Sequence, residues 1–365
     1  MSNPSSTSSS NPVGKKPQTV KVALLTFIIL LCVGLSLSIF RGSLEKIVGK
    51  SRLTPIFSYL EFHDPYDSQV IFLGSSHFVS GIKSDFFAKL SGMEPAKVLN
   101  LAADSEGSWE ELLLGRKYPS MFHASPLVII EVSPSMFNKN AIHPVYKTPY
   151  TFEPHFYTWA TLQERFEYPD LMLKLLLISD YVWPISERRS LYDWISVIQS
   201  IVNNRYVEPH LSVPLYQYDV GFVQSIANNP NFFAQNIAQN QLNNYEFANH
   251  KAEYLKRLIH LAEKKSTKKI ILLQTPVRKE YMDVIYNNPK YAETYTQYLR
   301  FIHSLENENV HAIIWETPKD CGLNDSVFID YGHFNILGAY NFTQRLFIEM
   351  KNRGIIVSHK NGGME

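Results

Sequence analysis

Short apolar runs that recur along the chain constrain its fold more than any other feature of the sequence. They lie at residues 70–73, 98–101, 127–130, 270–273 and 312–315. Each run has the length and composition of a strand that is buried on both faces. Helix-compatible stretches separate the runs, as at residues 251–263, where one helical face would carry Tyr254, Leu258 and Leu261. This alternation predicts an α/β domain, a three-layer flavodoxin-like fold built on a parallel sheet.

The first run, Val70–Leu73, ends abruptly in Gly74, Ser75, Ser76 and His77. Ligands bind at the carboxyl ends of parallel strands, so a serine at this point is directed at a substrate. Gly74 allows a sharp turn, after which Ser75 or Ser76 can present its hydroxyl and its backbone N–H to one reacting atom. Gly-Ser-Ser is also ordinary turn chemistry, so this stretch alone does not identify a nucleophile.

A second pair of chemically capable residues, Asp330 and His333, lies near the C-terminus. On one turn, the Asp330 carboxylate can accept the Nδ1 proton of His333, which leaves Nε2 free to take a proton from a serine. A helix is predicted to follow, with one apolar face made of Ala339, Phe342, Leu346 and Met350. Alone, such a pair can also be a capping or surface pair. Together with Ser76 it predicts a Ser-His-Asp triad.

These blocks resemble the SGNH hydrolase superfamily, the GDSL-like esterases and acyltransferases, over about residues 68–350 outside an insertion. Gly74-Ser75-Ser76 is similar to the Gly-Asp-Ser block of that family, with Ser76 at the nucleophile position. Asp330 and His333 are similar to its terminal Asp-x-x-His. The resemblance implies an SGNH-hydrolase-like fold in which Ser76 is acylated, His333 is the base and Asp330 orients it.

Two further blocks concern the oxyanion hole. Residues 100–104 resemble the Asn-x-Gly block of the family, with Ala102 in the glycine position, where a backbone N–H can still point at an oxyanion. Ser135 stands where the family has an asparagine, so its side-chain donor differs from the family pattern. Ser75, Ala102 and Ser135 are therefore the expected oxyanion or substrate-binding residues.

The Gly-Ser-Ser block together with Ser-Pro-x-x-Phe at residues 133–137 is similar to a membrane-anchored branch of the superfamily. That branch includes the D-alanyl transfer protein of teichoic acid modification and proteins that O-acetylate exported polysaccharides. The resemblance implies an acyltransferase or esterase whose acceptor is an envelope polysaccharide and whose acyl donor could come from a membrane acyltransferase partner. The altered third block leaves an alternative, a catalytically inactive scaffold or binding protein of an envelope polysaccharide assembly complex.

The N-terminal part of the chain has a different pattern. Residues 1–21 are rich in Ser, Asn, Pro and Lys, which predicts a disordered tail. Residues 22–40 are uncharged and mostly apolar, and about 19 such residues span the roughly 30 Å hydrocarbon core as one transmembrane helix. A cleaved signal peptide is the alternative. Basic residues flank both ends of the span, so charge does not decide its orientation. We expect residues 1–21 inside and the rest of the chain outside, because a single N-terminal span before a long domain most often acts as an uncleaved export signal.

The remaining boundaries follow from composition. Residues 41–66 are interpreted as a linker, residues 67–356 as the catalytic domain, and residues 357–365 as a disordered tail. Within the domain, residues 140–246 break the alternation of strands and helices and predict a partly helical insertion. Its Asn- and Gln-rich part, residues 228–244, is interpreted as a polar loop in preference to a glycan-contacting surface.

Charge and motif content argue against several other functions. Lys and Arg number 35 against 34 Asp and Glu, so no nucleic acid partner is expected. No zinc or nucleotide motif is present, and neither a metal nor a cofactor is expected. Cys32 and Cys321 give no disulfide framework, and Cys321 is interpreted as a packed thiol. His77 is interpreted as structural in preference to substrate-binding, and Gln274 and Thr275 are candidates for lining the pocket.

Overall fold

The computed structural model describes residues 65–103, 107–123, 126–141, 230–265 and 267–356, and the isolated positions Leu25, Ile28, Ile56 and Leu60. All but Leu25 and Ile28 belong to one compact unit of residues 50–174 and 209–365. No helix in the described part of the chain is long and apolar enough to cross a membrane. Apart from Leu25 and Ile28, the predicted tail and membrane span lie outside the described residues. So do most of the predicted linker and the whole of the C-terminal tail.

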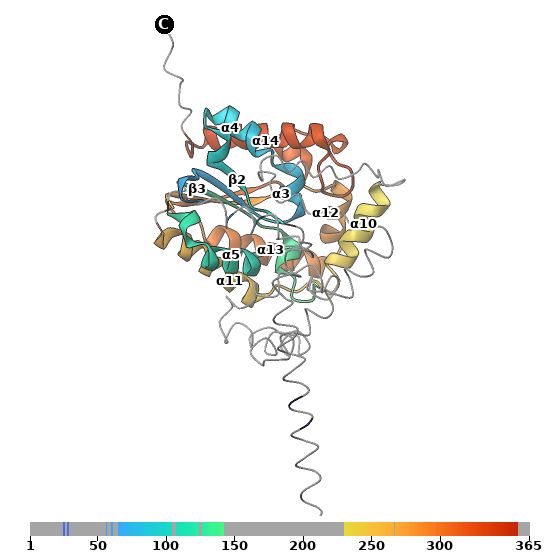
Figure 1. The fold of residues 1–365 in the computed structure, drawn as a ribbon. Coiled ribbons are helices and arrows are strands. Elements are labelled where there is room, and N and C mark those ends of the chain that lie inside the picture. The colour runs from blue at the N-terminus through green and yellow to red at the C-terminus, as the bar shows by residue number, and fades with distance from the viewer. Residues whose placement is uncertain are drawn as a thin grey trace, which may run out of the picture. The chain divides into compact units, whose positions relative to one another are not determined.

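A five-stranded sheet with the order β2-β1-β3-β4-β5 forms the centre of this unit (Figure 1). The strands are β1 (Val70–Leu73), β2 (Val98–Asn100), β3 (Leu127–Glu131), β4 (Lys269–Gln274) and β5 (Val310–Ile314). All neighbouring strands are parallel. Each predicted apolar run overlaps one strand, and the order is the one that flavodoxin-like sheets have. The predicted α/β class is confirmed.

Helices cover both faces of the sheet (Figure 1). On one face lie α3 (Ser76–Gly81), α4 (Ser84–Ser91) and α14 (Ile336–Asn352), and on the other α5 (Ser108–Lys117), α11 (Asn249–Lys264) and α13 (Pro289–Ser304). Alternate strand residues point to opposite faces, so Phe72 and Leu273 join one core cluster with Phe342 of α14. The predicted apolar face of α14 is fully buried at Ala339, Phe342, Leu346 and Met350.

The predicted helix at residues 251–263 lies within α11. Tyr254 and Leu258 are buried as the face predicts. Leu261 is only half-buried, because it borders a groove between α5 and α11. The buried face of α11 is completed instead by Leu255, Ile259 and Ala262.

The two described ends of the predicted insertion lie together. Asn138 and Phe247 form an antiparallel bridge, and Lys139 forms a 3.0 Å ion pair with Glu246. The predicted polar loop at residues 228–244 is wrong, because most of it forms α10 (Pro230–Gln241), which packs on α12 (Lys279–Tyr286). The reason is a narrow apolar stripe at a spacing of four residues, hidden among Asn and Gln, whose members Ala234, Ala238 and Leu242 are fully buried.

Candidate active site

The loop after β1 carries the predicted nucleophile. β2 and β3 pair with opposite edges of β1, so the strand order reverses there. In open parallel sheets a crevice for ligands forms at such a switch point. Ser75 is the N-cap of α3, and its hydroxyl accepts from the His77 backbone N–H at 3.4 Å. Ser76 is therefore the first residue of a helix and is half-buried. Among the described residues nothing accepts its backbone N–H, as is usual for the first helical residue.

The structure brings Ser76 together with the two residues near the C-terminus. His333 Nε2 lies 2.7 Å from Ser76 Oγ, and His333 Nδ1 lies 2.6 Å from Asp330 Oδ2. When Nδ1 carries the proton and donates it to Asp330, Nε2 accepts from the serine hydroxyl. The three side chains thus form a continuous hydrogen-bonded row across 257 residues of sequence.

The Asp330 carboxylate is held ionised by its neighbours. Its Oδ1 accepts from the backbone N–H groups of Gly332 at 3.0 Å and His333 at 2.8 Å. Burial raises the pKa of Asp330, but the hydrogen bonds and charge of His333 and the two backbone donors outweigh it, so the pKa lies below its ordinary value. The carboxylate can therefore orient the imidazole and stabilise its charged form.

Arg278 holds the loop that carries Asp330. Its Nε donates to the Asp330 carbonyl at 2.8 Å, and its backbone N–H donates to the Tyr331 carbonyl at 2.8 Å. A second guanidinium nitrogen donates to the Asp325 carbonyl at 3.2 Å. Because Arg278 is 9% exposed, these bonds are shielded from water and fix the loop just before His333.

A second histidine and carboxylate pair lies beside the first. Glu131, the last residue of β3, is fully buried and accepts from the Ser75 backbone N–H at 2.7 Å and the Ser75 hydroxyl at 2.9 Å. His77 Nδ1 lies 3.0 Å from Glu131 Oε1. The His77 ring stands 5.1 Å from the ring of His333 and 5.4 Å from that of Tyr331. The structural interpretation of His77 agrees with this burial.

Glycines make room for the second pair. A Cβ at Gly74 would come within 2.7 Å of Glu131, and a Cβ at Gly332 would come within 2.9 Å of His77 Nε2. Both distances are shorter than real Cβ contacts allow. The Glu131–His77 pair therefore requires glycine at both Gly74 and Gly332.

The predicted oxyanion residues have other partners. The N–H and hydroxyl of Ser75 both donate to Glu131, and the Ala102 N–H donates to Asn100 Oδ1 at 3.2 Å. Ser135 Oγ lies 3.1 Å from Ser133 Oγ, and either hydroxyl can be the donor. Burial raises the pKa of Tyr281 well above its usual value, and the neighbouring Ser135 side chain opposes that rise. Ser75 also caps α3 through its hydroxyl oxygen, while its N–H and O–H groups both bond Glu131.

The C-terminal end of the insertion reaches the triad loop through α10. Gln241 donates from Nε2 to the Tyr331 hydroxyl at 3.0 Å and accepts from the Tyr281 hydroxyl at 2.9 Å. The rings of Tyr281 and Tyr331 are stacked, with centroids 5.6 Å apart. These contacts place α10 and α12 at the same edge of the sheet as Ser76, next to Tyr331.

Other sequence candidates lie apart from this arrangement. Gln274 is buried and bonds Tyr295 and Tyr298 instead of lining an open pocket, whereas the Thr275 hydroxyl is buried without a partner among the described residues. Burial raises the pKa of Cys321 to about 12, which leaves it a poor nucleophile at neutral pH. No group of His, Cys, Asp and Glu in the described ranges could hold a metal ion.

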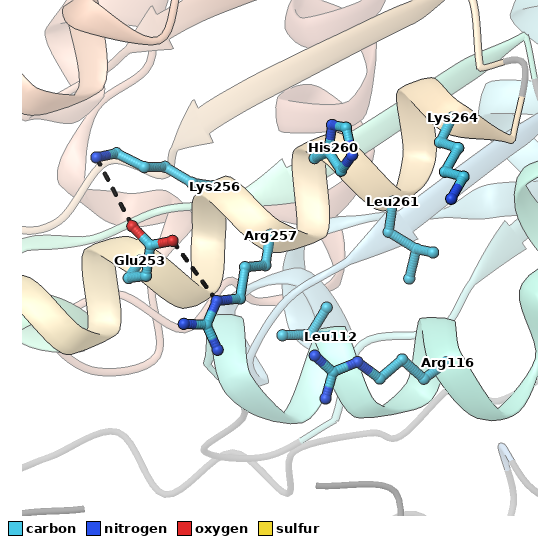
Figure 2. Close-up of a pocket in the computed structure, with 8 residues that line it drawn as sticks. All are labelled: Leu112, Arg116, Glu253, Lys256, Arg257, His260, Leu261 and Lys264. Atoms are coloured by element: carbon cyan, nitrogen blue, oxygen red, sulfur yellow. Dashed lines mark ion pairs between the residues drawn. The ribbon is translucent and has the colours of Figure 1, made fainter. Parts of the chain in front are cut away.

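A separate cavity of about 460 Å³ lies between α5 and α11 (Figure 2). Figure 2 shows Glu253 between Lys256 and Arg257, with which it forms ion pairs of 3.8 Å and 3.5 Å. Arg116 and Lys264 add two further cationic side chains to its wall. Because only residues of these two helices line it, this basic cavity does not include Ser76, Asp330 or His333.

Sequence reasoning missed Glu131, Arg278 and Gln241. The sequence does indicate Glu131, because a carboxylate there interrupts the apolar stretch of residues 127–132. A charged group buried in a strand needs hydrogen-bond partners. Arg278 and Gln241 act on groups 52 and 90 residues away in sequence and have no local signal. Neither protein-family models nor curated protein sequences give a match to this chain.

Proposed function

We propose that this protein is a serine esterase or acyltransferase of the SGNH type that forms an acyl intermediate on Ser76. The observation that carries the proposal is the row from Asp330 through His333 to Ser76, with 2.6 Å and 2.7 Å separations. Nucleophile, base and orienting carboxylate are the three parts that acyl transfer through serine needs.

The proposed first step joins the acyl group to the protein. Ser76 Oγ attacks the carbonyl carbon of the acyl donor while its proton moves to His333 Nε2, and Asp330 stabilises the imidazolium. The backbone N–H of Ser76 itself is available to donate to the oxyanion that develops on the acyl group. Collapse of the tetrahedral intermediate breaks the bond to the leaving group, which takes the proton from His333.

The second step releases the acyl group. A hydroxyl of the acceptor, or water, gives its proton to His333 as its oxygen attacks the acyl carbon. The bond between the acyl carbon and Ser76 Oγ then breaks, and Oγ takes the proton back from His333. We propose an envelope polysaccharide as acceptor because the motifs resemble the membrane-anchored branch of the superfamily. An acceptor held in attack geometry gains an effective molarity of about 10⁵ M or more, which favours transfer over hydrolysis.

The inactive scaffold remains the second candidate, favoured by a specific observation. Two of the three predicted oxyanion residues, Ser75 and Ala102, already donate their backbone N–H groups to other side chains. Labelling with a serine-reactive fluorophosphonate separates the two candidates. We expect stoichiometric labelling of the wild type and none of Ser76→Ala, while Ser304→Ala, an exposed serine on α13, labels normally.

Ester hydrolysis gives the matching rate measurement. Removing the serine of a working triad costs on the order of a million-fold in kcat, so Ser76→Ala should fall to background. Absent labelling of the folded wild type would contradict the enzyme and favour the scaffold. So would complementation of a deletion strain by Ser76→Ala.

The proposed location is a membrane, with residues 1–21 in the cytoplasm and the domain outside. Alkaline phosphatase fused after Glu365 should then be active, and a fluorescent protein fused there should be dark. The reverse pair of results would contradict the orientation.

A further inference from the structure

We propose that Glu131 and His77 are a positioning pair that sets the distance between the Ser76 nucleophile and the His333 base. The inference rests on the proposed function, since it concerns the geometry of the same reaction. It assigns a role to two buried residues that the proposed acyl transfer does not itself use.

The first step of the argument is what Glu131 holds. Its carboxylate accepts from the backbone N–H of Ser75 at 2.7 Å and from His77 Nδ1 at 3.0 Å. These are the residues immediately before and after Ser76. The nucleophile is therefore tied on both sides to one side chain at the end of β3, and its backbone cannot shift without breaking a buried hydrogen bond.

The second step is what His77 touches. Its ring lies 5.1 Å from the His333 ring and 5.4 Å from the Tyr331 ring, and its Nε2 is the first atom that a Cβ at Gly332 would meet. His77 thus packs against three consecutive residues of the base loop. The pair joins the nucleophile loop on one side to the base loop on the other.

The third step concerns the atom that His77 leaves unused. Nε2 is buried and has no hydrogen-bond partner among the described residues, and the whole residue is 7% exposed. An apolar side chain would fill this space without a buried unpaired nitrogen. Histidine instead provides an Nδ1 donor for Glu131 on a flat ring that fits between the two loops. We therefore assign His77 the role of positioning other groups, with no proton transfer of its own.

The test compares substitutions that keep or remove the bond to Glu131. His77→Leu removes it, whereas the amide of His77→Asn can still donate to Glu131 Oε1. Glu131→Gln keeps the shape of the side chain but removes one accepting oxygen. The control is His303→Leu, which breaks the chemically identical pair of His303 with Glu306, 2.8 Å apart and exposed on and just beyond α13.

The measurements are kcat and KM for a small acetyl ester and the rate of fluorophosphonate labelling, all on the full chain. A misplacement of about 1 Å costs roughly 100-fold in rate, so His77→Leu and Glu131→Gln should lose about that much in kcat and labelling. KM should stay within about threefold, because ground-state binding is not removed. His77→Asn should regain at least tenfold over His77→Leu, and His303→Leu should match the wild type.

Several outcomes would overturn the inference. Wild-type rates in both folded His77→Leu and Glu131→Gln would show that the pair positions nothing. His77→Asn as slow as His77→Leu would contradict a role that depends on the hydrogen bond to Glu131. If His77→Leu does not fold, Glu131→Gln alone decides. No labelling of the wild type overturns the proposed function and this inference together, whereas labelled wild type with unaffected variants overturns this inference alone.

Discussion

The site contains the same two chemical groups twice, in different surroundings. Asp330 and His333 lie 2.6 Å apart with side chains 19% and 14% exposed, whereas Glu131 and His77 lie 3.0 Å apart with 0% and 8% exposed. In the first pair the second nitrogen of the imidazole meets Ser76. In the second it lies beside Gly332, and it forms no hydrogen bond with any residue that the structure describes. The pairing of histidine with a carboxylate therefore does not define the role, which depends on what the far nitrogen can reach.

The same substitution in each pair should separate the two roles most strongly. Asp330→Asn removes the charge that stabilises the imidazolium and favours the wrong tautomer of His333. A loss of about 10⁴-fold in kcat is typical of that change in a serine triad. Glu131→Gln should cost only about 100-fold, because it disturbs position and leaves the base itself intact. Esterase assays of the two variants side by side measure the difference.

Equal losses in the two variants would remove the distinction between them. So would a Glu131→Gln enzyme slower than Asp330→Asn. Circular dichroism spectra that match the wild type would exclude unfolding as the cause of either loss.

The fold could be predicted because its signal is local. Buried parallel strands are continuous apolar runs, so Val70–Leu73 and its equivalents are visible without knowing their neighbours. The sequence did not predict α10 because its fully buried residues are only two alanines, Ala234 and Ala238, at a spacing of four in a stretch rich in Asn and Gln. Helix formation there depends on packing against α12, which composition does not report.

The site could be predicted in part, for a related reason. Ser76, Asp330 and His333 each stand in a short motif that indicates their chemistry. The partner of Ser75 could not be predicted in this way, because Glu131 lies 56 residues away in the sequence. A backbone N–H is present at every such position, and only tertiary contacts decide whether it is free.

Adding one methyl group to the base loop should test how closely the two pairs are packed. In Gly332→Ala the new Cβ would lie 2.9 Å from His77 Nε2 and 3.2 Å from Val277, so the loop or the ring must move. We expect esterase activity to fall by about 10- to 100-fold, with a stability loss of about 1–3 kcal/mol from overpacking. Gly107→Ala is the control, since its nearest neighbour would lie 3.6 Å away.

Wild-type activity in Gly332→Ala would show that the base loop yields without moving His333. The Glu131–His77 pair would then be less rigid than its burial indicates. Urea unfolding of both alanine variants gives the stability difference, and ester hydrolysis gives the rate.

The smallest expected effect is the pH dependence of stability that comes from Asp330. Its pKa in the folded protein lies below the ordinary value, since the bonds and charge from His333 and the backbone outweigh burial. A group of this kind adds stability that is present above its unfolded pKa of about 3.9 and is lost as the pH falls through the folded value. The gap in unfolding free energy between the wild type and Asp330→Asn should therefore be constant near pH 7 and narrow below about pH 4. Asp283→Asn, which breaks an exposed pair with Lys279, should differ from the wild type by about 1 kcal/mol or less. A gap for Asp330→Asn that stays unchanged down to pH 3 would mean that this carboxylate gains nothing from its ionised state, and the distinction between the two pairs would then rest on geometry alone.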